Sequence, residues 1–277
     1  KSATPGPDVQ APETPADLGV VAGSTALTVR WAPATDDVEV DHYEVTVGDD
    51  TLAVPTPSGA VEGLSPDTTY PVRVSAVDAA GNAYIAGYTD STKFPVTSDA
   101  YQKTSRGGRE GFVAKLAPDG RSLVYATYIG GSSTDEIRGL ALAPSGEVWV
   151  TGRTYSSDFP VTPNALQTAN AGTPDSFVSK LDANGRTLLF STFCGGASYD
   201  EGTAVVLDAA GDAYVTGWTM STNFPVTANA YRKTVQFLDA FVTKFSSAGS
   251  LTYSTLVGGY GSDYGLAIAV DAAGSAY

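Results

Sequence analysis

The tetrapeptide Phe-Pro-Val-Thr occurs three times in the chain, at residues 94–97, 159–162 and 224–227. The separation is 65 residues both times, and the flanking sequence repeats with the tetrapeptide. A copied sequence at a fixed period of this kind indicates a repeat architecture in which each copy folds as one structural unit. We therefore expect three such units in the C-terminal part of the chain.

Each unit carries four short apolar runs separated by Gly, Pro and Asp residues. In the first unit they are residues 83–87, residues 112–116, a run ending at Gly130-Gly131, and residues 140–142. Four short strands joined by such turns are typical of one β-propeller blade. One sheet cannot bury both of its faces alone, so we expect the blades to stack around an axis. The positions expected to pack between blades are Phe94, Pro95, Phe159, Pro160, Phe224 and Pro225.

The units resemble the SBBP-type β-propeller repeat of secreted and surface proteins of bacteria and archaea. The resemblance rests on Phe-Pro-Val-Thr, on Phe-Val-x-Lys-Leu at residues 112–116, on the Gly-Gly pair and on the Asp-Ala-Ala-Gly turn. It covers roughly residues 76–277 and implies an extracellular location with a binding or structural role. Within a repeat region of residues 81–277, the expected blades are residues 81–145, 146–210 and 211–277.

Three blades are fewer than the four to eight with which propellers close. Residues 76–84 and 269–277 are nearly identical, as if a fourth copy began near residue 269. Either further blades complete the propeller or copies of the chain assemble together. An open array would expose strand edges, which favour self-association.

The N-terminal part of the chain has a different pattern. Residues 1–15 carry four prolines among small polar residues, which predicts an extended inter-domain linker. Residues 16–80 alternate apolar and polar residues in short runs, for example at residues 27–31 and 43–47. This alternation predicts half-buried strands and a β-sandwich. The fold class expected for the whole chain is all-β, a sandwich followed by an incomplete propeller.

The sandwich region resembles a fibronectin type III domain. The resemblance is carried by a strand that ends at Trp31, by the run at residues 43–45 and by the Leu-Ser-Pro-Asp-Thr-Thr-Tyr stretch at residues 64–70. It implies that Trp31 is the core tryptophan and that Tyr70 is the corner tyrosine, whose phenol bonds to upstream backbone. The family's last strand should follow residue 82, where the first repeat begins. The sandwich therefore either shares that strand or lacks it.

The charge of the chain excludes some classes of partner. It carries 30 Asp and Glu against 16 Lys and Arg, a formal net charge of −14. Phosphate backbones and anionic lipid repel such a protein, so nucleic acid is not expected as a partner. No stretch reaches the roughly 20 apolar residues that a membrane-spanning helix needs.

Side chains with catalytic chemistry are few. The only histidine, His42, has no partner at a metal-ligand spacing, which indicates a solvent-facing strand residue. The only cysteine, Cys194, takes the place of Ile129 and Val257 in the other repeats, which indicates a buried apolar position. Residues that recur in every blade are expected to serve the blade. The recurring lysines, expected to cover apolar surface or pair with carboxylates, are Lys115, Lys180 and Lys244.

Acidic loops follow each Gly-Gly pair and provide a candidate metal site. Carboxylates in Gly- and Ser-rich loops suit Ca²⁺, although the full calcium-loop signature is absent. Turn capping explains the same residues equally well, and no other cofactor is expected. The calcium candidates are Asp135, Glu136, Asp200, Glu201 and Asp263.

No nucleophile elbow, phosphate loop or paired-carboxylate motif occurs in the sequence, so we expect no enzymatic activity. The favoured function is an extracellular scaffold, secreted or at the cell surface, that serves adhesion, surface assembly or ligand capture. The alternative is an accessory spacer and carbohydrate-binding region of a secreted polysaccharide-degrading enzyme. A propeller enzyme with its site on the central axis is a third option. The expected partners are other modules of a longer chain and, in the alternative, polysaccharide.

Overall fold

The structure of the chain is a computed structural model that describes residues 82–143 and 145–277 and, before them, the backbone of six strands. Every regular element of the described residues is a β-strand, so the chain is all-β. No helix among them is long and apolar enough to cross a membrane. The strands are β1 (Gly19–Ala22), β2 (Ala26–Arg30), β3 (Tyr43–Val47), β4 (Asp50–Val54), β5 (Ser58–Glu62), β6 (Val72–Ala76), β7 (Ala83–Thr89), β8 (Glu110–Leu116), β9 (Leu123–Ile129), β10 (Asp135–Leu142), β11 (Val148–Thr154), β12 (Asp175–Leu181), β13 (Leu188–Phe193), β14 (Asp200–Leu207), β15 (Ala213–Thr219), β16 (Asp239–Phe245) and β17 (Leu251–Val257).

The six N-terminal strands form two antiparallel sheets of three strands. One sheet has the order β1-β2-β5 and the other the order β4-β3-β6. β7 pairs along its whole length with β8 and so belongs to the first blade. Among the described strands, β6 therefore has no last sandwich strand beside it. The linker at residues 1–15 and the predicted roles of Trp31, His42 and Tyr70 lie outside the described residues.

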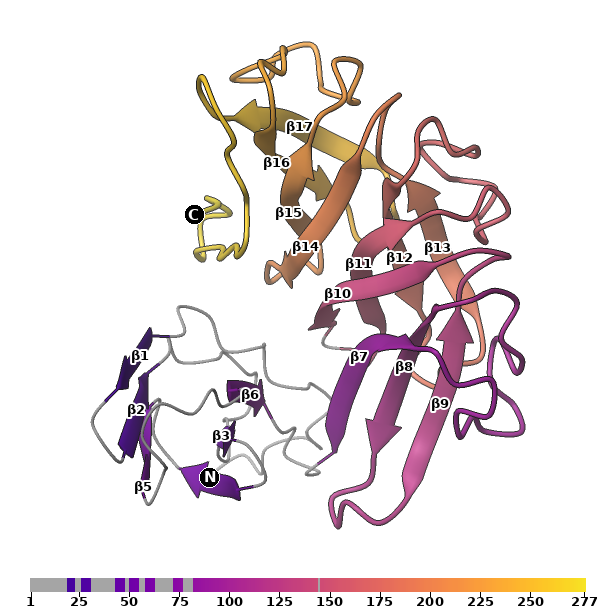
Figure 1. Ribbon diagram of the computed structural model, residues 1–277, viewed down its shortest axis with the longest axis vertical. Helices are drawn as coiled ribbons and strands as arrows, with labels where there is room; N and C mark the ends of the chain where they lie inside the picture. The colour runs from indigo at the N-terminus through magenta and orange to yellow at the C-terminus, as the bar shows by residue number, and fades with distance from the viewer. Residues whose placement is uncertain are drawn as a thin grey trace, which may run out of the picture.

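Three antiparallel sheets follow and form the blades of the repeat region. The first sheet has the order β7-β8-β9, the second β10-β11-β12-β13 and the third β14-β15-β16-β17. In Figure 1 the three sheets fan out side by side, with β7, β10 and β14 on the inner side and β9, β13 and β17 on the outer side. Within each of these sheets, the order of the strands from the inner to the outer side is their order along the chain.

The strands are grouped into sheets differently from the grouping expected from the sequence, with the sheet boundaries displaced by one strand. Residues 140–142 are expected to close the first blade, whereas they belong to β10, the innermost strand of the second sheet. A tight turn joins β10 to β11, because Ala143 N–H donates to Glu147 O at 2.8 Å and Gly146 adopts a φ of 85°. The segment after β9 instead carries the chain across to the next sheet. The expected blades at 146–210 and 211–277 therefore begin one strand late, and the expected blade at 81–145 ends one strand late.

Apolar side chains fill the space between neighbouring sheets. One cluster joins the first sheet to the second, with Val113 and Ile129 on one side and Val150 on the other. A second cluster joins the second sheet to the third, where the rings of Phe190 and Phe245 lie 5.6 Å apart. Burial of this surface contributes about 25 cal/mol per Å². Each sheet is therefore stabilised by the one beside it.

The three Phe-Pro-Val-Thr segments share one environment. Each phenylalanine packs at a tilt on a phenylalanine of the strand next to the outermost one, which is β8, β12 or β16, with ring centroids 4.5, 4.4 and 4.7 Å apart. The threonine N–H of each segment donates at 3.0 Å to a backbone oxygen of the outermost strand. The second and third of these rings belong to the clusters shared with the preceding sheet. The ring pairs are Phe94–Phe112, Phe159–Phe177 and Phe224–Phe241.

Candidate functional site

Cys194 is fully buried between the second and third sheets. Burial raises the pKa of its thiol to about 12, so the thiolate is not formed near neutral pH. Ile129 has the equivalent position in the first sheet and is also fully buried. This side chain therefore fills the core and does no chemistry.

The recurring lysines lie over aromatic rings. The Nζ atom of Lys115 is 4.7 Å from the ring centroid of Tyr84, and that of Lys180 is 5.5 Å from the ring centroid of Trp149. Lys244 repeats the arrangement and also forms an ion pair with Asp208 at 2.9 Å. These contacts are cation–π interactions between neighbouring strands, β7 with β8, β11 with β12 and β15 with β16.

The acidic loops turn their first carboxylate inward. Asp135 accepts hydrogen bonds from Gly131 N–H at 2.7 Å and from the Ser156 hydroxyl at 2.9 Å. Asp200 accepts the equivalent bonds from Gly196 N–H and the Ser221 hydroxyl, each at 2.7 Å. The side chains of Asp135 and Asp200 are fully buried. Their carboxylates tie the Gly-Gly loop to the following blade strand.

A second buried acid lies beside each of these aspartates. A Cβ atom placed on Gly130 would be 2.5 Å from an oxygen of Glu110 and 2.6 Å from an oxygen of Asp135. Burial raises the pKa of Asp135 and that of Asp200 to about 6, although their hydrogen-bond donors oppose the shift. Sequence analysis did not identify the second acid. The equivalent pairs in the other repeats are Asp175 with Asp200 and Asp239 with Asp263.

Calcium binding at these loops stays a prediction. The oxygens of Asp135 and Asp200 face N–H and O–H donors, which is the surrounding of a capping carboxylate. Within the described residues no group of three or more His, Cys, Asp or Glu side chains is placed to hold a metal ion.

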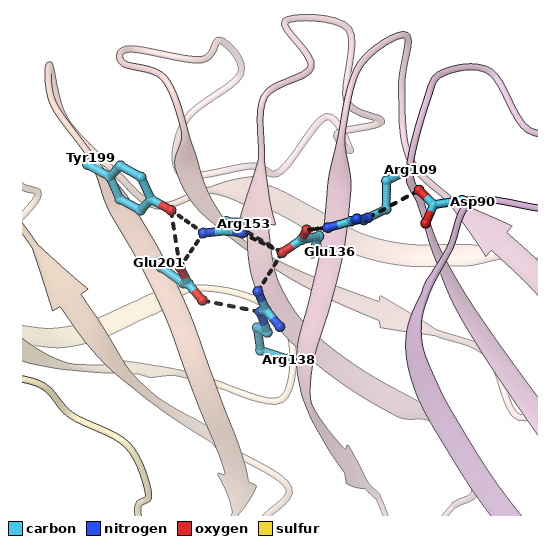
Figure 2. A network of polar contacts seen from close by, with 7 residues as sticks. All are labelled: Asp90, Arg109, Glu136, Arg138, Arg153, Tyr199 and Glu201. Atoms are coloured by element: carbon cyan, nitrogen blue, oxygen red, sulfur yellow. Dashed lines mark hydrogen bonds and ion pairs between the residues drawn. The ribbon is translucent and has the colours of Figure 1, made fainter.

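Glu136 and Glu201 belong to a network of charged side chains that crosses all three sheets (Figure 2). Glu136 is 1% exposed, and one of its oxygens accepts a hydrogen bond from Arg109 Nη1 at 2.6 Å. Its other oxygen lies 2.5 Å from Arg138 Nη2 and 2.7 Å from Arg153 Nη2. Three guanidinium groups therefore surround one buried carboxylate.

The same arginines reach the third sheet through Glu201. Arg153 Nη1 lies 3.0 Å from Glu201 Oε2, and Arg138 Nε lies 3.2 Å from Glu201 Oε1. Arg153 Nη1 also donates to the hydroxyl of Tyr199. At the other end, Arg109 Nε donates to Asp90 at 3.2 Å. We call these residues the rim network, which consists of Asp90, Arg109, Glu136, Arg138, Arg153, Tyr199 and Glu201.

The ion pairs of the rim network favour the charged forms of Glu136 and Arg153. Burial favours the neutral form of Glu136, but the hydrogen bond from Arg109 and the charges of Arg153 and Arg138 outweigh it and lower its pKa. Burial opposes the charge of Arg153 in the same way, and Glu201 and Glu136 outweigh it and raise the pKa of Arg153. Because every oxygen of Glu136 is held by an arginine, this carboxylate is not available as a base.

Aromatic side chains border the rim network. The guanidinium of Arg109 lies 4.6 Å from the ring centroid of Tyr88, whose side chain is 41% exposed. Farther along, the Tyr199 ring stacks on Trp218 with centroids 4.6 Å apart and an interplanar angle of 13°. Tyr264 meets Trp218 edge-on at 5.5 Å and is 53% exposed. We call this set the aromatic row, which consists of Tyr88, Tyr155, Tyr199, Trp218 and Tyr264.

The aromatic row and the rim network together form a surface suited to binding. Flat aromatic faces pack against apolar faces of a ligand, while fixed guanidinium and carboxylate groups offer hydrogen bonds beside them. Sequence analysis identified Glu136 and Glu201 but missed Arg109, Arg138 and Arg153. Tyr88, Arg153 and Trp218 occupy one repeat position, so a varying residue in a repeated strand was the available signal. Trp149, in contrast, is fully buried in the core.

Two protein families match parts of the chain. Residues 12–86 match the fibronectin type III domain, and residues 190–225 match the beta-propeller repeat. The chain combines these two modules. The repeat match runs from β13 through β14 and β15 to the third Phe-Pro segment, and therefore crosses from the second sheet into the third.

Relatives of known name match over about a third of the chain, in its fibronectin type III-like region. Chitinase A1 of Niallia circulans is 39% identical over 94 residues, which are 33% of this chain and 13% of that protein. Exoglucanase B of Cellulomonas fimi is 40% identical over 92 residues, 31% of this chain and 8% of that protein. Chitinase Chi52 of Paenibacillus xylanexedens is 38% identical over 99 residues, 34% and 18% respectively. The chain thus spans less than a fifth of each relative.

Among solved structures, chitinase ChiA74 from Bacillus thuringiensis is a chain to which this one is similar. It matches 71% of this chain and 29% of its own chain at 16% identity, with a TM-score of 0.27. A likeness at this level supports no conclusion about function.

Proposed function

We propose that the chain is a non-catalytic accessory region of a secreted polysaccharide-degrading protein. In this proposal the fibronectin type III domain is a spacer and the blades bind polysaccharide through the aromatic row. The observation that carries it is the row of partly exposed aromatic rings that borders the paired charges of the rim network along the three sheets.

The relatives support the class of ligand. Two of them are named chitinases and one an exoglucanase, and this chain matches each over a segment of roughly fibronectin type III length. Polymers of this class are large, and their hydrolysis takes place outside the cell. An extracellular location follows from the proposal.

The ring chemistry of a sugar suits the surface. The C–H face of a pyranose is apolar and packs on a flat aromatic ring, while its hydroxyls project sideways toward hydrogen-bonding groups. Trp218, partly exposed and already stacked on Tyr199, is the largest such platform. The charged groups beside it are paired with one another, which supports recognition of a neutral polymer.

An adhesion or surface-assembly scaffold is the second candidate. Repeated blades and an acidic surface are compatible with it. The names of the relatives give it less support than they give the accessory role.

Binding to insoluble polymers tests the proposal. Depletion from solution by chitin and by cellulose would be measured for the wild-type chain and for Trp218→Ala. We expect the wild type to bind at least one polymer and the variant to bind it about thirtyfold more weakly, because a central Trp contributes about 2 kcal/mol at many interfaces. The matched control is Tyr231→Ala, since Tyr231 is 87% exposed but lies outside the aromatic row.

Three results would contradict the proposal. A wild-type chain that neither polymer retains would exclude the binding role. Equal retention of Trp218→Ala and the wild type would exclude the aromatic row. Release of reducing ends from either polymer by the chain alone would show that it is catalytic.

A further inference from the structure

The second and third sheets differ at the repeat position that lies opposite the buried glutamate. In the second sheet Arg153 of β11 lies opposite Glu136 of β10, and Arg153 Nη2 is 2.7 Å from Glu136 Oε2. In the third sheet the residue opposite Glu201 is Trp218. Glu201 therefore has an indole ring opposite it, and its guanidinium partners, Arg138 and Arg153, come from the second sheet.

Tyr199 is a second residue that occurs once at its repeat position. It is the third residue after a Gly-Gly pair, where the other two repeats have Thr134 and Ser262. Its backbone serves the blade as in the other sheet, because Met220 N–H donates to Tyr199 O at 2.9 Å, just as Tyr155 N–H donates to Thr134 O. The loop therefore forms without a tyrosine side chain at this position.

The side chain of Tyr199 connects the rim network to Trp218. Its ring stacks on the indole, with centroids 4.6 Å apart and an interplanar angle of 13°. Its hydroxyl accepts a hydrogen bond from Arg153 Nη1 and lies 3.5 Å from Glu201 Oε2 (Figure 2). One end of this side chain is thus held by charged groups, while its face supports the tryptophan.

The groups that hold the hydroxyl are themselves fixed. Arg153 lies 2.7 Å from Glu136 and 3.0 Å from Glu201, and its side chain is 20% exposed. Glu201 is 10% exposed and lies 3.2 Å from Arg138 as well. A guanidinium bound by two carboxylates has a defined orientation, so it offers the phenol a fixed anchor.

We propose that Tyr199 is a positioning residue, which Arg153 anchors so that Trp218 presents its indole ring in one orientation. The ligand, a pyranose ring, is taken from the proposed function, whereas the anchoring is a property of the free chain. Binding to an ordered ring does not require that the ring be immobilised first, and this raises the affinity. Tyr199 therefore acts on the ligand through Trp218.

Fluorine NMR of the chain labelled with 5-fluorotryptophan measures the anchoring without a ligand. The sequence has three tryptophans, and the signal that is lost in Trp218→Phe belongs to Trp218. Tyr199→Phe keeps the ring but removes the hydroxyl, whereas Tyr199→Leu removes both. We expect the Trp218 signal to shift in Tyr199→Phe and to shift farther in Tyr199→Leu, because the stacked ring changes the magnetic field at the indole. The signal of Trp149, which is fully buried, should stay in place and report an intact core.

Arg153→Met tests whether the arginine is the anchor. The variant removes the donor to the Tyr199 hydroxyl and leaves Glu201 paired with Arg138. It should shift the Trp218 signal as Tyr199→Phe does, and the double variant should shift it no farther, since both changes remove the same hydrogen bond. Shifts that add in the double variant would contradict the anchoring. The matched control is Tyr231→Phe, at a position 87% exposed and outside the aromatic row, which should leave the tryptophan signals unchanged.

Binding to polymer separates this proposal from the proposed function. Tyr199→Phe should bind the polymer that retains the wild type about fivefold more weakly, because Trp218 must then be ordered on binding. Equal binding by Tyr199→Phe and the wild type would overturn the positioning role. A Trp218 signal that is the same in the wild type, Tyr199→Phe and Tyr199→Leu would overturn it too. If neither polymer retains the wild type, the proposed function is contradicted, and the fluorine spectra alone decide whether Tyr199 anchors Trp218.

Discussion

At the residue scale, repeat position decides what a side chain does. The position of Cys194 accepts Ile129 in one repeat and Val257 in another, and the cysteine is a buried apolar residue, as this pattern predicts. Equivalent residues are buried wherever a neighbouring sheet covers them. The residues that vary, such as Arg153 and Trp218 at one shared position, instead form the candidate binding surface.

The buried aspartates Asp135 and Asp200 should make the stability of the chain depend on pH. Burial raises the pKa of Asp135 and Asp200 to about 6, from an ordinary value near 4. Between about pH 4 and pH 6 the folded chain binds more protons than the unfolded chain, so stability falls as the pH rises through this range. Urea unfolding should give a free energy roughly 2 kcal/mol higher at pH 5 than at pH 7.5.

Replacement by asparagine provides the control for this pH dependence. The double variant Asp135→Asn with Asp200→Asn should show a smaller difference in the free energy of unfolding between pH 5 and pH 7.5, because the amide does not titrate. Glu136 acts in the opposite sense, since its lowered pKa removes stability only below about pH 4. A wild-type chain that is more stable at pH 7.5 than at pH 5 would contradict the burial of these carboxyl groups.

At the element scale, the sequence predicted the strands but not their grouping. Alternation and turn residues located β7 to β17, and Phe-Pro-Val-Thr marked one environment in each unit. A periodic sequence reports the length of its repeat but not where a unit begins, so residues 140–142 were assigned to the wrong sheet. The rim network was missed for a related reason. Its arginines occur once each, and their contacts join strands that are far apart in sequence.

Close contact between β10 and β11 requires a glycine at residue 152. A Cβ atom there would lie 1.9 Å from the backbone oxygen of Glu136, and no side-chain movement relieves this contact. The variant Gly152→Ala should lower the free energy of unfolding by about 3 kcal/mol. Denaturation in urea would measure it. A change of less than about 0.5 kcal/mol would mean that β10 does not lie beside β11.

At the scale of the whole molecule, each blade is stabilised by the sheets beside it. The clusters between the first and second sheets, and between the second and third, leave no blade with a core of its own. The same principle explains why Ile85 and Val257 are partly exposed, whereas residues at equivalent positions between two described sheets are buried. Composition and repeats predicted an all-β chain with an open array. The candidate binding surface was not predictable from them, because the aromatic row is assembled from three different sheets.

Hydrogen–deuterium exchange of the backbone amides tests most directly that each repeat passes its last strand to the next sheet. Peptides from β10 and β14 should be protected as strongly as those from β11 and β15, since both partners of each pair share one hydrogen-bond ladder. If β10 and β14 exchanged as fast as the loop at residues 258–262 while β11 and β15 stayed protected, the described arrangement of blades would be wrong.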